Sequence, residues 1–285
     1  MIFKKGTCTQ LALVRIWVFG ILLLDLGVDD LARLAYFPGE AFVSHGLMKV
    51  IPYSILDVLL RPEGLSAFVW VYAGALVAGL VGAGWAWLTT GLALILTAIF
   101  HGLGRGFGGH VNHQELIVLF CLLFLMTRPA YSSLSVSSLF GAGRSDSDAQ
   151  ADGVARLMLR CLCFWIFLTY FMIGMARIQT GKWGSYASPA IEYYAYVHSL
   201  KWNYWDFSGA AHLMESPALQ GFLRVSFPFA TILELAAPLA VFRSKLTPFI
   251  VILLFGFHVM ILMFMNIFFW QNILLLGIPP FGLAP

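Results

Sequence analysis

Polar and ionisable side chains lie near the ends of several strongly hydrophobic segments of the sequence. The imidazole of His258 can donate one hydrogen bond and accept another, which suits proton transfer, the oxygen of a quinone or a plain hydrogen bond between two helices. Tyr170, Gly174 and Arg177 follow an i, i+4, i+7 spacing, which places them on one face of a helix. Gly174 would let a neighbouring helix or a ligand approach that face closely. The other polar members of this group are His101, Arg105, His110, Asn112, His113, Gln114, Glu115, Asn266 and Gln271.

A metal site is the less favoured interpretation of these histidines. His101, His110 and His113 occur in the segment HGLGRGFGGHVNH, and their spacing is not a recognised zinc pattern. Asp or Glu residues in a metal-binding pattern do not accompany these histidines. We therefore predict no metal site.

A second polar group lies in the predicted inner halves of three hydrophobic segments: Arg15, Arg160 and Glu234. A charged side chain inside a bilayer costs about 2.5 to 3.5 kcal/mol on insertion scales, so such a group is expected to find a partner. We predict that Glu234 forms a structural ion pair with Arg15 or Arg160 and that the pair fixes helix packing.

The composition identifies lipid as the solvent in which these groups are positioned. Hydrophobic residues make up 60% of the 285 residues and charged residues only 11%, against about 45 to 50% and about 25% in soluble domains. The net charge of +3 is small and dispersed, which argues against a nucleic-acid partner. Seven apolar segments are long enough to be membrane-spanning helices. They are residues 11–28, 64–84, 86–103, 114–130, 154–176, 219–242 and 247–275, the last of which is long enough to tilt or to break near Asn266.

The predicted fold is an all-α polytopic transmembrane bundle of about seven spans. Residues 1–285 form a single membrane domain, with a first half at 1–140, a flexible cytoplasmic link at 141–153 and a second half at 154–285. Basic residues in the short inner loops favour a cytoplasmic amino terminus. The aromatic-rich loops 29–63 and 183–207 predict interfacial helices on the outer face.

Four sequence blocks resemble successive parts of the HTTM domain, the membrane domain of vitamin K-dependent gamma-glutamyl carboxylase and its bacterial relatives. These blocks are NHQELIVLFCLLFL from Asn112, YFMIGMARI from Tyr170, ELAAPLAVF from Glu234 and FHVMILMFMNIFFW from Phe257. The resemblance is best from about residue 110 to residue 278. It implies an outward-facing pocket for a quinone-like or lipid ligand, built around His113, Arg177 and His258 as candidate catalytic residues. Asn112, Tyr170, Gly174 and Asn266 are the candidate ligand-binding residues.

The sequence departs from the carboxylase at two points. The histidine of the first block, which lines the vitamin K hydroquinone site in that family, corresponds to His113, but the family's proposed catalytic lysine falls on Arg177. A guanidinium keeps its proton and cannot act as a general base at neutral pH. The chain also ends eight residues after Gly277, without the carboxylase's large lumenal region, so we do not expect protein gamma-carboxylation.

Two functions follow from these observations. In the first, His113 and His258 hydrogen-bond a quinone-like or lipid ligand, a quinone being the candidate cofactor, and Arg177 stabilises an anionic oxygen, with redox or transfer chemistry on that ligand. In the second, the bundle is a non-enzymatic membrane subunit or anchor that assists a membrane or secreted protein partner, as in peptide maturation or immunity. The lipid bilayer is a partner in both.

Overall fold

The computed structural model describes residues 8–28, 31–44, 46–107, 113–139, 148–179, 190–201 and 209–282. These residues are helical, with turns between the helices, and they contain no β-strand. The chain divides into two compact units, an amino-terminal unit of residues 1–162 and a carboxyl-terminal unit of residues 163–285. The all-helical fold class predicted from the sequence is therefore confirmed for the described part of the chain.

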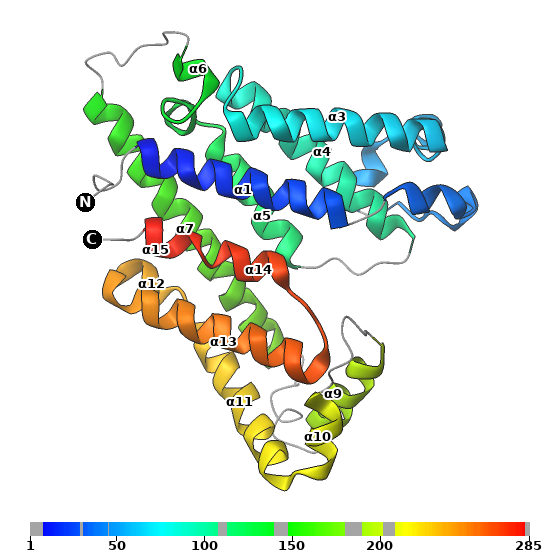
Figure 1. Cartoon of the computed structure of the whole chain (residues 1–285), viewed down its shortest axis with the longest axis vertical. Coiled ribbons are helices and arrows are strands. Elements are labelled where there is room, and N and C mark those ends of the chain that lie inside the picture. Colours follow the sequence, from blue (N-terminus) through cyan, green and yellow to red (C-terminus); the bar gives the residue numbers. More distant parts are fainter. Residues whose placement is uncertain are drawn as a thin grey trace. The chain divides into compact units, whose positions relative to one another are not determined.

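Long apolar helices form the amino-terminal unit. They are α1 (Cys8–Val28), α3 (Pro62–Val81), α4 (Ala86–Gly106) and the shorter α5 (His113–Leu125). Helix α1 lies alongside α3, and α4 packs against both α3 and α5 (Figure 1). A side chain at Gly79 of α3 would overlap the ring of Phe19, so this glycine permits the close approach of α1 and α3.

Short helices occupy the chain between α1 and α3 and the chain after α5. The first set is η1 (Leu31–Tyr36), η2 (Gly39–Ala41), η3 (Gly46–Val50) and α2 (Tyr53–Leu59), and the second is η4 (Arg128–Tyr131) and α6 (Val136–Leu139). The predicted loop at 29–63 thus contains short helices, and their position in the membrane interface stays a prediction. Their exposed aromatic residues, including Tyr36 and Tyr53, are of the kind that lies in the headgroup layer.

Helix α7 (Asp148–Gln179) is a single helix of 32 residues that contains the boundary between the two units. Its first turns correct the predicted flexible link at 141–153, because residues 148–153 are already helical. The side chain of Asp152 accepts a hydrogen bond of 3.0 Å from the backbone nitrogen of Cys8. This contact with α1 attaches the start of α7 to the amino-terminal unit, a constraint that composition alone does not reveal. Residues 140–147 lie outside the described part of the chain.

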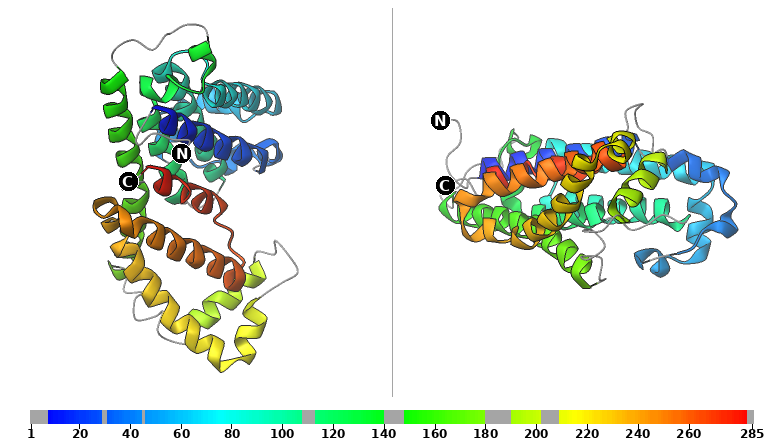
Figure 2. Two further views of the ribbon diagram at one scale, coloured as in Figure 1. Left: turned by 60° about the vertical axis from the view of Figure 1, so that its left-hand side comes forward. Right: turned by 90° about the horizontal axis from the view of Figure 1, so that it is seen from below.

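The carboxyl-terminal unit contains the rest of α7 and a set of packed helices. These are α9 (Ala190–Lys201), α10 (Gly209–Glu215), α11 (Pro217–Ala236), α12 (Leu239–Phe242), η5 (Ser244–Leu246), α13 (Thr247–Met265), α14 (Trp270–Leu275) and α15 (Ile278–Gly282). Figure 2 shows α9 and α10 beside the end of α13. The core of this unit comes from four helices: Ile191 and Ala195 of α9, Leu213 of α10, Leu223, Phe227 and Ala230 of α11, and Phe257, Ile261 and Met265 of α13.

Five helices among the described residues are long and apolar enough to cross a membrane: α1, α3, α4, α7 and α13. They correspond to five of the seven predicted spans. The segment predicted at 114–130 forms only the 13-residue α5, because the chain turns into η4, where Pro129 cannot continue an α-helix. The segment predicted at 219–242 forms α11, which is not one of the five.

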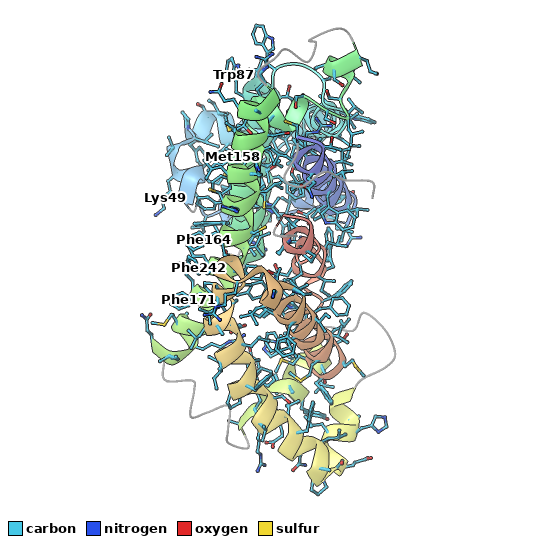
Figure 3. All side chains as sticks on the ribbon, turned by 90° about the vertical axis from the view of Figure 1, so that its left-hand side faces the viewer. Lys49, Trp87, Met158, Phe164, Phe171 and Phe242 are labelled. Atoms are coloured by element: carbon cyan, nitrogen blue, oxygen red, sulfur yellow. The ribbon has the colours of Figure 1, made fainter. Side chains whose placement is uncertain are left out.

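The outer surfaces of these helices carry large apolar side chains, as expected for contact with lipid. Trp87 projects from α4 with 59% of its surface exposed, and Figure 3 shows it extending away from the helices. Exposed side chains of this size are costly in water over a large area. The surface therefore agrees with an integral membrane protein, as does the length of the five helices.

Candidate functional site

Two polar pairs of the carboxyl-terminal unit use the same face of α7. Tyr170 and Arg177 are seven residues apart on this helix, which is almost two full turns. Tyr170 forms a hydrogen bond with His258 of α13, and Arg177 forms an ion pair with Glu234 of α11. The predicted helical face therefore exists, and it joins α7 to two other helices of this unit.

The pair formed by Tyr170 and His258 is deeply buried. The phenol oxygen lies 2.8 Å from Nε2 of the imidazole, and the two residues are only 2% and 3% exposed. Aromatic rings surround the imidazole, with the centroids of Phe257 and Phe269 each 5.7 Å from that of His258. A phenol and a neutral imidazole can each donate or accept in such a bond, so this pair can pass a proton to or from a bound oxygen.

The pair formed by Arg177 and Glu234 joins the end of α7 to the end of α11. Nη1 of Arg177 donates a hydrogen bond of 2.7 Å to Oε2 of Glu234, and Glu234 is only 1% exposed. The Arg177 guanidinium also lies over the ring of Phe257, 5.4 Å from its centroid. Because the carboxylate neutralises the guanidinium, this arrangement presents little net charge to a ligand.

Gly174 lies between these two pairs on α7, and it allows α11 to approach. A Cβ atom at this position would lie 3.1 Å from Cγ of Leu235 and 3.3 Å from Cβ of Glu234. These separations are shorter than ordinary van der Waals contact between carbon atoms. Of the two neighbours that the sequence allowed at Gly174, a helix or a ligand, the structure shows a helix.

Asn266 ends α13 and contributes a buried amide. It adopts a left-handed backbone with φ of 54°, a conformation that asparagine tolerates better than most residues. The long hydrophobic segment at 247–275 therefore breaks at this residue. Asn266 is 2% exposed, and neither its Nδ2 nor its Oδ1 atom has a hydrogen-bond partner among the described residues. Leaving a buried polar group unsatisfied costs about 1 to 3 kcal/mol, so this amide is a candidate for binding a ligand or a water molecule.

Two further buried amides follow Asn266 at the start of α14. Gln271 is 6% exposed and Asn272 is 1% exposed. Sequence reasoning identified Asn266 and Gln271 but missed Asn272, although an Asn inside the apolar run QNILLL was a signal for it. Three carboxamides are therefore buried in a short stretch of chain that also contains Phe269, whose ring contacts His258.

The predicted pairing of Glu234 with Arg15 or Arg160 is corrected by the structure. Glu234 pairs with Arg177, whereas Arg160 is exposed and lies 17 residues earlier on α7, about 25 Å along the helix axis. The error came from the assigned depths. Glu234 was placed in the inner half of its span and Arg177 at the outer end of another, but their ion pair requires both groups to lie at one level.

Both terminal nitrogens of the Arg15 guanidinium bond to backbone carbonyls inside the amino-terminal unit, whereas its buried Nε has no hydrogen-bond partner among the described residues. Its Nη1 donates a hydrogen bond of 2.8 Å to the oxygen of Ala130, and its Nη2 donates one of 2.5 Å to the oxygen of Leu134. The guanidinium also stacks on the ring of Tyr131. Burial raises the pKa of the Tyr131 phenol, which stays neutral and bonds Thr90 at 2.8 Å. Sequence patterns do not identify backbone acceptors of this kind, because they depend on where the chain turns.

The remaining predicted site residues belong to the amino-terminal unit. His113 is the first residue of α5, and its side chain, together with Asn112 and His110, lies outside the described part of the chain. The prediction that His113 joins Arg177 and His258 at one ligand therefore stays a prediction. Within the described ranges, the side chains of His, Cys, Asp and Glu form no group of three or more that could hold a metal ion.

Comparisons with known protein families, with characterised proteins and with solved structures find no match for this chain. The functional argument therefore depends on the site itself. That site consists of the Tyr170–His258 pair, the neutral Arg177–Glu234 pair and the buried amide of Asn266, all in the carboxyl-terminal unit.

Proposed function

We propose that this chain is an integral membrane protein whose carboxyl-terminal unit binds a neutral, largely apolar molecule with a carbonyl or hydroxyl oxygen, of the quinone or lipid class. The observation that carries this proposal is the amide of Asn266, which is buried without a hydrogen-bond partner among the described residues. A carboxamide both donates and accepts hydrogen bonds, so it matches such an oxygen and its neighbouring groups.

The charges of the site favour a neutral ligand. The sequence assigned Arg177 to an anionic oxygen, but its guanidinium is 2.7 Å from the Glu234 carboxylate. Binding an anion there would require either breaking this pair or placing an unbalanced negative charge beside it, and both are costly in a low-dielectric environment. A neutral carbonyl or hydroxyl avoids that cost.

Proton exchange with the ligand is assigned to Tyr170 and His258. Asn266 lies eight residues after His258, about 12 Å along the axis of α13. The chain then turns back, and the ring of Phe269 contacts the imidazole. In this proposal, Asn266 holds one polar group of an elongated ligand, and the Tyr170–His258 pair lies at the other end of the same segment.

The resemblance to the HTTM domain supports the same class of ligand. It depends on four sequence blocks, and three of them contain residues of this site: Tyr170 and Arg177, Glu234, and His258 with Asn266. We also propose a cytoplasmic amino terminus, on the basis of the basic residues in the short predicted inner loops, and a bacterial inner membrane, on the basis of the resemblance to the bacterial relatives of the HTTM domain.

A non-enzymatic subunit that assists a membrane or secreted protein is the second candidate function. The observation that favours it is the exposed apolar face of α9, where Tyr193, Tyr194 and Leu200 are 70%, 49% and 68% exposed. Aromatic side chains of this kind are common at the centres of protein interfaces. The same face would also suit the lipid headgroup layer.

Mass spectrometry of small molecules extracted from the mildly purified full chain tests the first proposal. The wild-type protein is expected to retain a quinone-sized or lipid occupant. Asn266→Gly should lower its occupancy about tenfold, because glycine keeps the left-handed backbone while the lost hydrogen bonds are worth about 1.4 kcal/mol. Leu134→Gly is the matched control, since Leu134 also has a positive φ, 48°, and should leave occupancy unchanged.

Two results would contradict the ligand proposal. One is equal occupancy in wild type and Asn266→Gly. The other is the stable copurification of one protein partner with no small molecule bound, which would support the second candidate. In that case changes on the exposed face of α9, such as Tyr193→Ala, should release the partner.

A further inference from the structure

The turn between α3 and α4 carries two exposed indole rings that the proposed function does not use. Trp85 immediately precedes α4, and Trp87 lies in the first turn of that helix. They are 70% and 59% exposed, and their rings stack with centroids 6.3 Å apart and an interplanar angle of 19°. The stack therefore presents a large surface that is apolar on its ring faces and polar at its N–H groups.

The backbone of this turn is tight and hydrogen-bonded. Gly82 and Gly84 have φ angles of 69° and 77°, which reverse the chain within a few residues. The hydroxyl of Ser137 in α6 donates a hydrogen bond of 2.8 Å to the oxygen of Gly82. The hydroxyl of Thr89 donates one of 2.8 Å to the oxygen of Ala83. The two indoles are thus carried by a turn whose carbonyls are bonded inside the protein.

The chain from η4 to α6 lies at the same level as this turn. Arg15 donates hydrogen bonds to the oxygen of Ala130 in η4 and to the oxygen of Leu80 in the last turn of α3. The phenol of Tyr131 in η4 bonds the hydroxyl of Thr90 in α4 at 2.8 Å. Figure 1 shows α6 beside the end of α3. Helix η4 therefore lies beside the first turns of α4, at the level of the indole rings.

Unpaired positive charge accompanies the indoles at this level. Arg128 begins η4; it is exposed and forms neither an ion pair nor a hydrogen bond with the described residues. Arg156 of α7 is exposed too, one turn after Asp152, whose carboxylate bonds the backbone of Cys8 at the start of α1. The other described acidic side chains of this unit lie toward the opposite ends of these helices or in α2: Asp25, Asp57, Glu63 and Glu115. This end of the unit therefore carries an excess of positive charge among its described side chains.

The headgroup of an anionic phospholipid matches both features. Helices α3 and α4 are each long and apolar enough to cross a membrane, so the turn that joins them is expected to lie at a membrane surface. Indole rings favour that layer, because the ring can lie among acyl chains while the N–H bonds a headgroup. A guanidinium binds a phosphate through two parallel N–H groups.

We propose that Trp85, Trp87 and Arg128 form a binding site for the phosphate headgroup of an anionic phospholipid, with Arg156 adding to the attraction. The indoles fix the depth of the α3–α4 turn in the headgroup layer, and Arg128 supplies the preference for negative charge. The site lies in the amino-terminal unit and is independent of the ligand proposed for the carboxyl-terminal unit.

Native mass spectrometry of the full chain tests the charge preference, with an equimolar mixture of phosphatidylglycerol and phosphatidylcholine as the probe. The first lipid bound to the wild-type chain should be phosphatidylglycerol in preference to phosphatidylcholine. Arg128→Gln should lower that preference about fivefold, which corresponds to about 1 kcal/mol for one basic residue near an anionic surface. An unchanged preference in Arg128→Gln would overturn the proposal.

Arg61→Gln is the matched control, because it changes the net charge of the chain by the same amount. The Arg61 guanidinium is already paired with Asp57 at 2.7 Å, and it lies at the start of α3 and not at its end. The control should keep the preference of the wild type. An equal loss in both variants would show a general attraction to charge and would overturn the assignment to this turn.

The depth of the indoles is tested on the wild-type sequence by fluorine magnetic resonance of the chain labelled with fluorotryptophan in lipid bilayers. Single Trp→Phe variants serve only to assign the signals. A paramagnetic group on the lipid headgroup should broaden the signals of Trp85 and Trp87 more than that of Trp70, which is 76% exposed but lies about 16 Å before the end of α3. A paramagnetic group at the end of an acyl chain should do the reverse. Trp87 broadened no more than Trp70 by the headgroup probe would overturn the proposal.

Discussion

The guanidinium of Arg177 donates a hydrogen bond of 2.7 Å to the carboxylate of Glu234, and this ion pair connects α7 to α11. The contact changes the role that the sequence assigned to Arg177. A free guanidinium could stabilise an anion, whereas a paired one holds two helices together and leaves the site close to neutral. The chemistry available to a ligand then comes from Tyr170, His258 and Asn266.

Breaking the ion pair from one side should destabilise the fold. Glu234→Gln leaves the partly buried Arg177 without its counter-charge, and we expect a loss of about 3 kcal/mol in the free energy of unfolding. The double variant Arg177→Met with Glu234→Leu should lose less than the sum of the single changes, since it removes both charges. Unfolding of the detergent-solubilised protein measures these values.

The control for that experiment is the exposed pair of Arg61 and Asp57. Surface ion pairs contribute about 0 to 1 kcal/mol, so Asp57→Asn should have only a small effect. If Glu234→Gln costs no more than Asp57→Asn, the pair does not stabilise the contact between α7 and α11.

Two glycines of α7 should respond in opposite ways to replacement by alanine. A Cβ at Gly153 meets nothing within 4 Å, and Gly153→Ala should stabilise the helix by up to about 1 kcal/mol. Gly174→Ala should instead cost about 1 to 3 kcal/mol, because its Cβ crowds Leu235 and Glu234. Thermal unfolding of both variants tests this, and equal effects would argue against close packing at Gly174.

Removing the Tyr170 hydroxyl should alter His258 specifically. Tyr170→Phe keeps the ring but removes the 2.8 Å contact with Nε2, so we expect a changed nitrogen resonance of His258 and a loss of about 1 to 3 kcal/mol in stability. Tyr72→Phe is the matched control, because that buried phenol bonds Thr97. The control should leave the His258 resonance unchanged, and a similar change in both variants would contradict the assignment.

Arg15 should be replaceable only at a cost, even though its hydrogen bonds go to backbone oxygens. Arg15→Met leaves the carbonyls of Ala130 and Leu134 without these donors, at about 1 to 3 kcal/mol for each. Arg15→Lys should recover only part of this loss, because an ammonium cannot reproduce the planar arrangement of donors. We expect the free energy of unfolding to fall in the order wild type, Arg15→Lys, Arg15→Met. An Arg15→Met variant as stable as wild type would contradict this prediction.

The proposed orientation can be tested with a single cysteine at position 148, where α7 begins. In a background without the four native cysteines, Asp148→Cys should react with a membrane-impermeant reagent only from the cytoplasmic side. Labelling from the outer side of intact cells would reverse the orientation.

Composition and hydrophobic segment length were sufficient to determine the solvent and the class of this protein. A chain with 60% hydrophobic and 11% charged residues is expected to form helices in lipid. Every backbone polar group must be hydrogen-bonded within the protein there, and a helix satisfies these groups within one segment. Helical spacing also placed Tyr170, Gly174 and Arg177 on one face, because that relationship is local to a single helix. The break at Asn266 was one of the two alternatives that the length of its segment allowed.

Only the tertiary structure decided which side chains meet. The partners of Glu234 and Arg15 come from other segments, and their identity depends on the depth and rotation of each helix relative to its neighbours. These quantities are set by packing contacts such as those at Gly79 and Gly174, where the absence of a side chain lets two helices approach. Hydropathy reports how apolar a segment is, but it carries no information on which face of that segment contacts which neighbour.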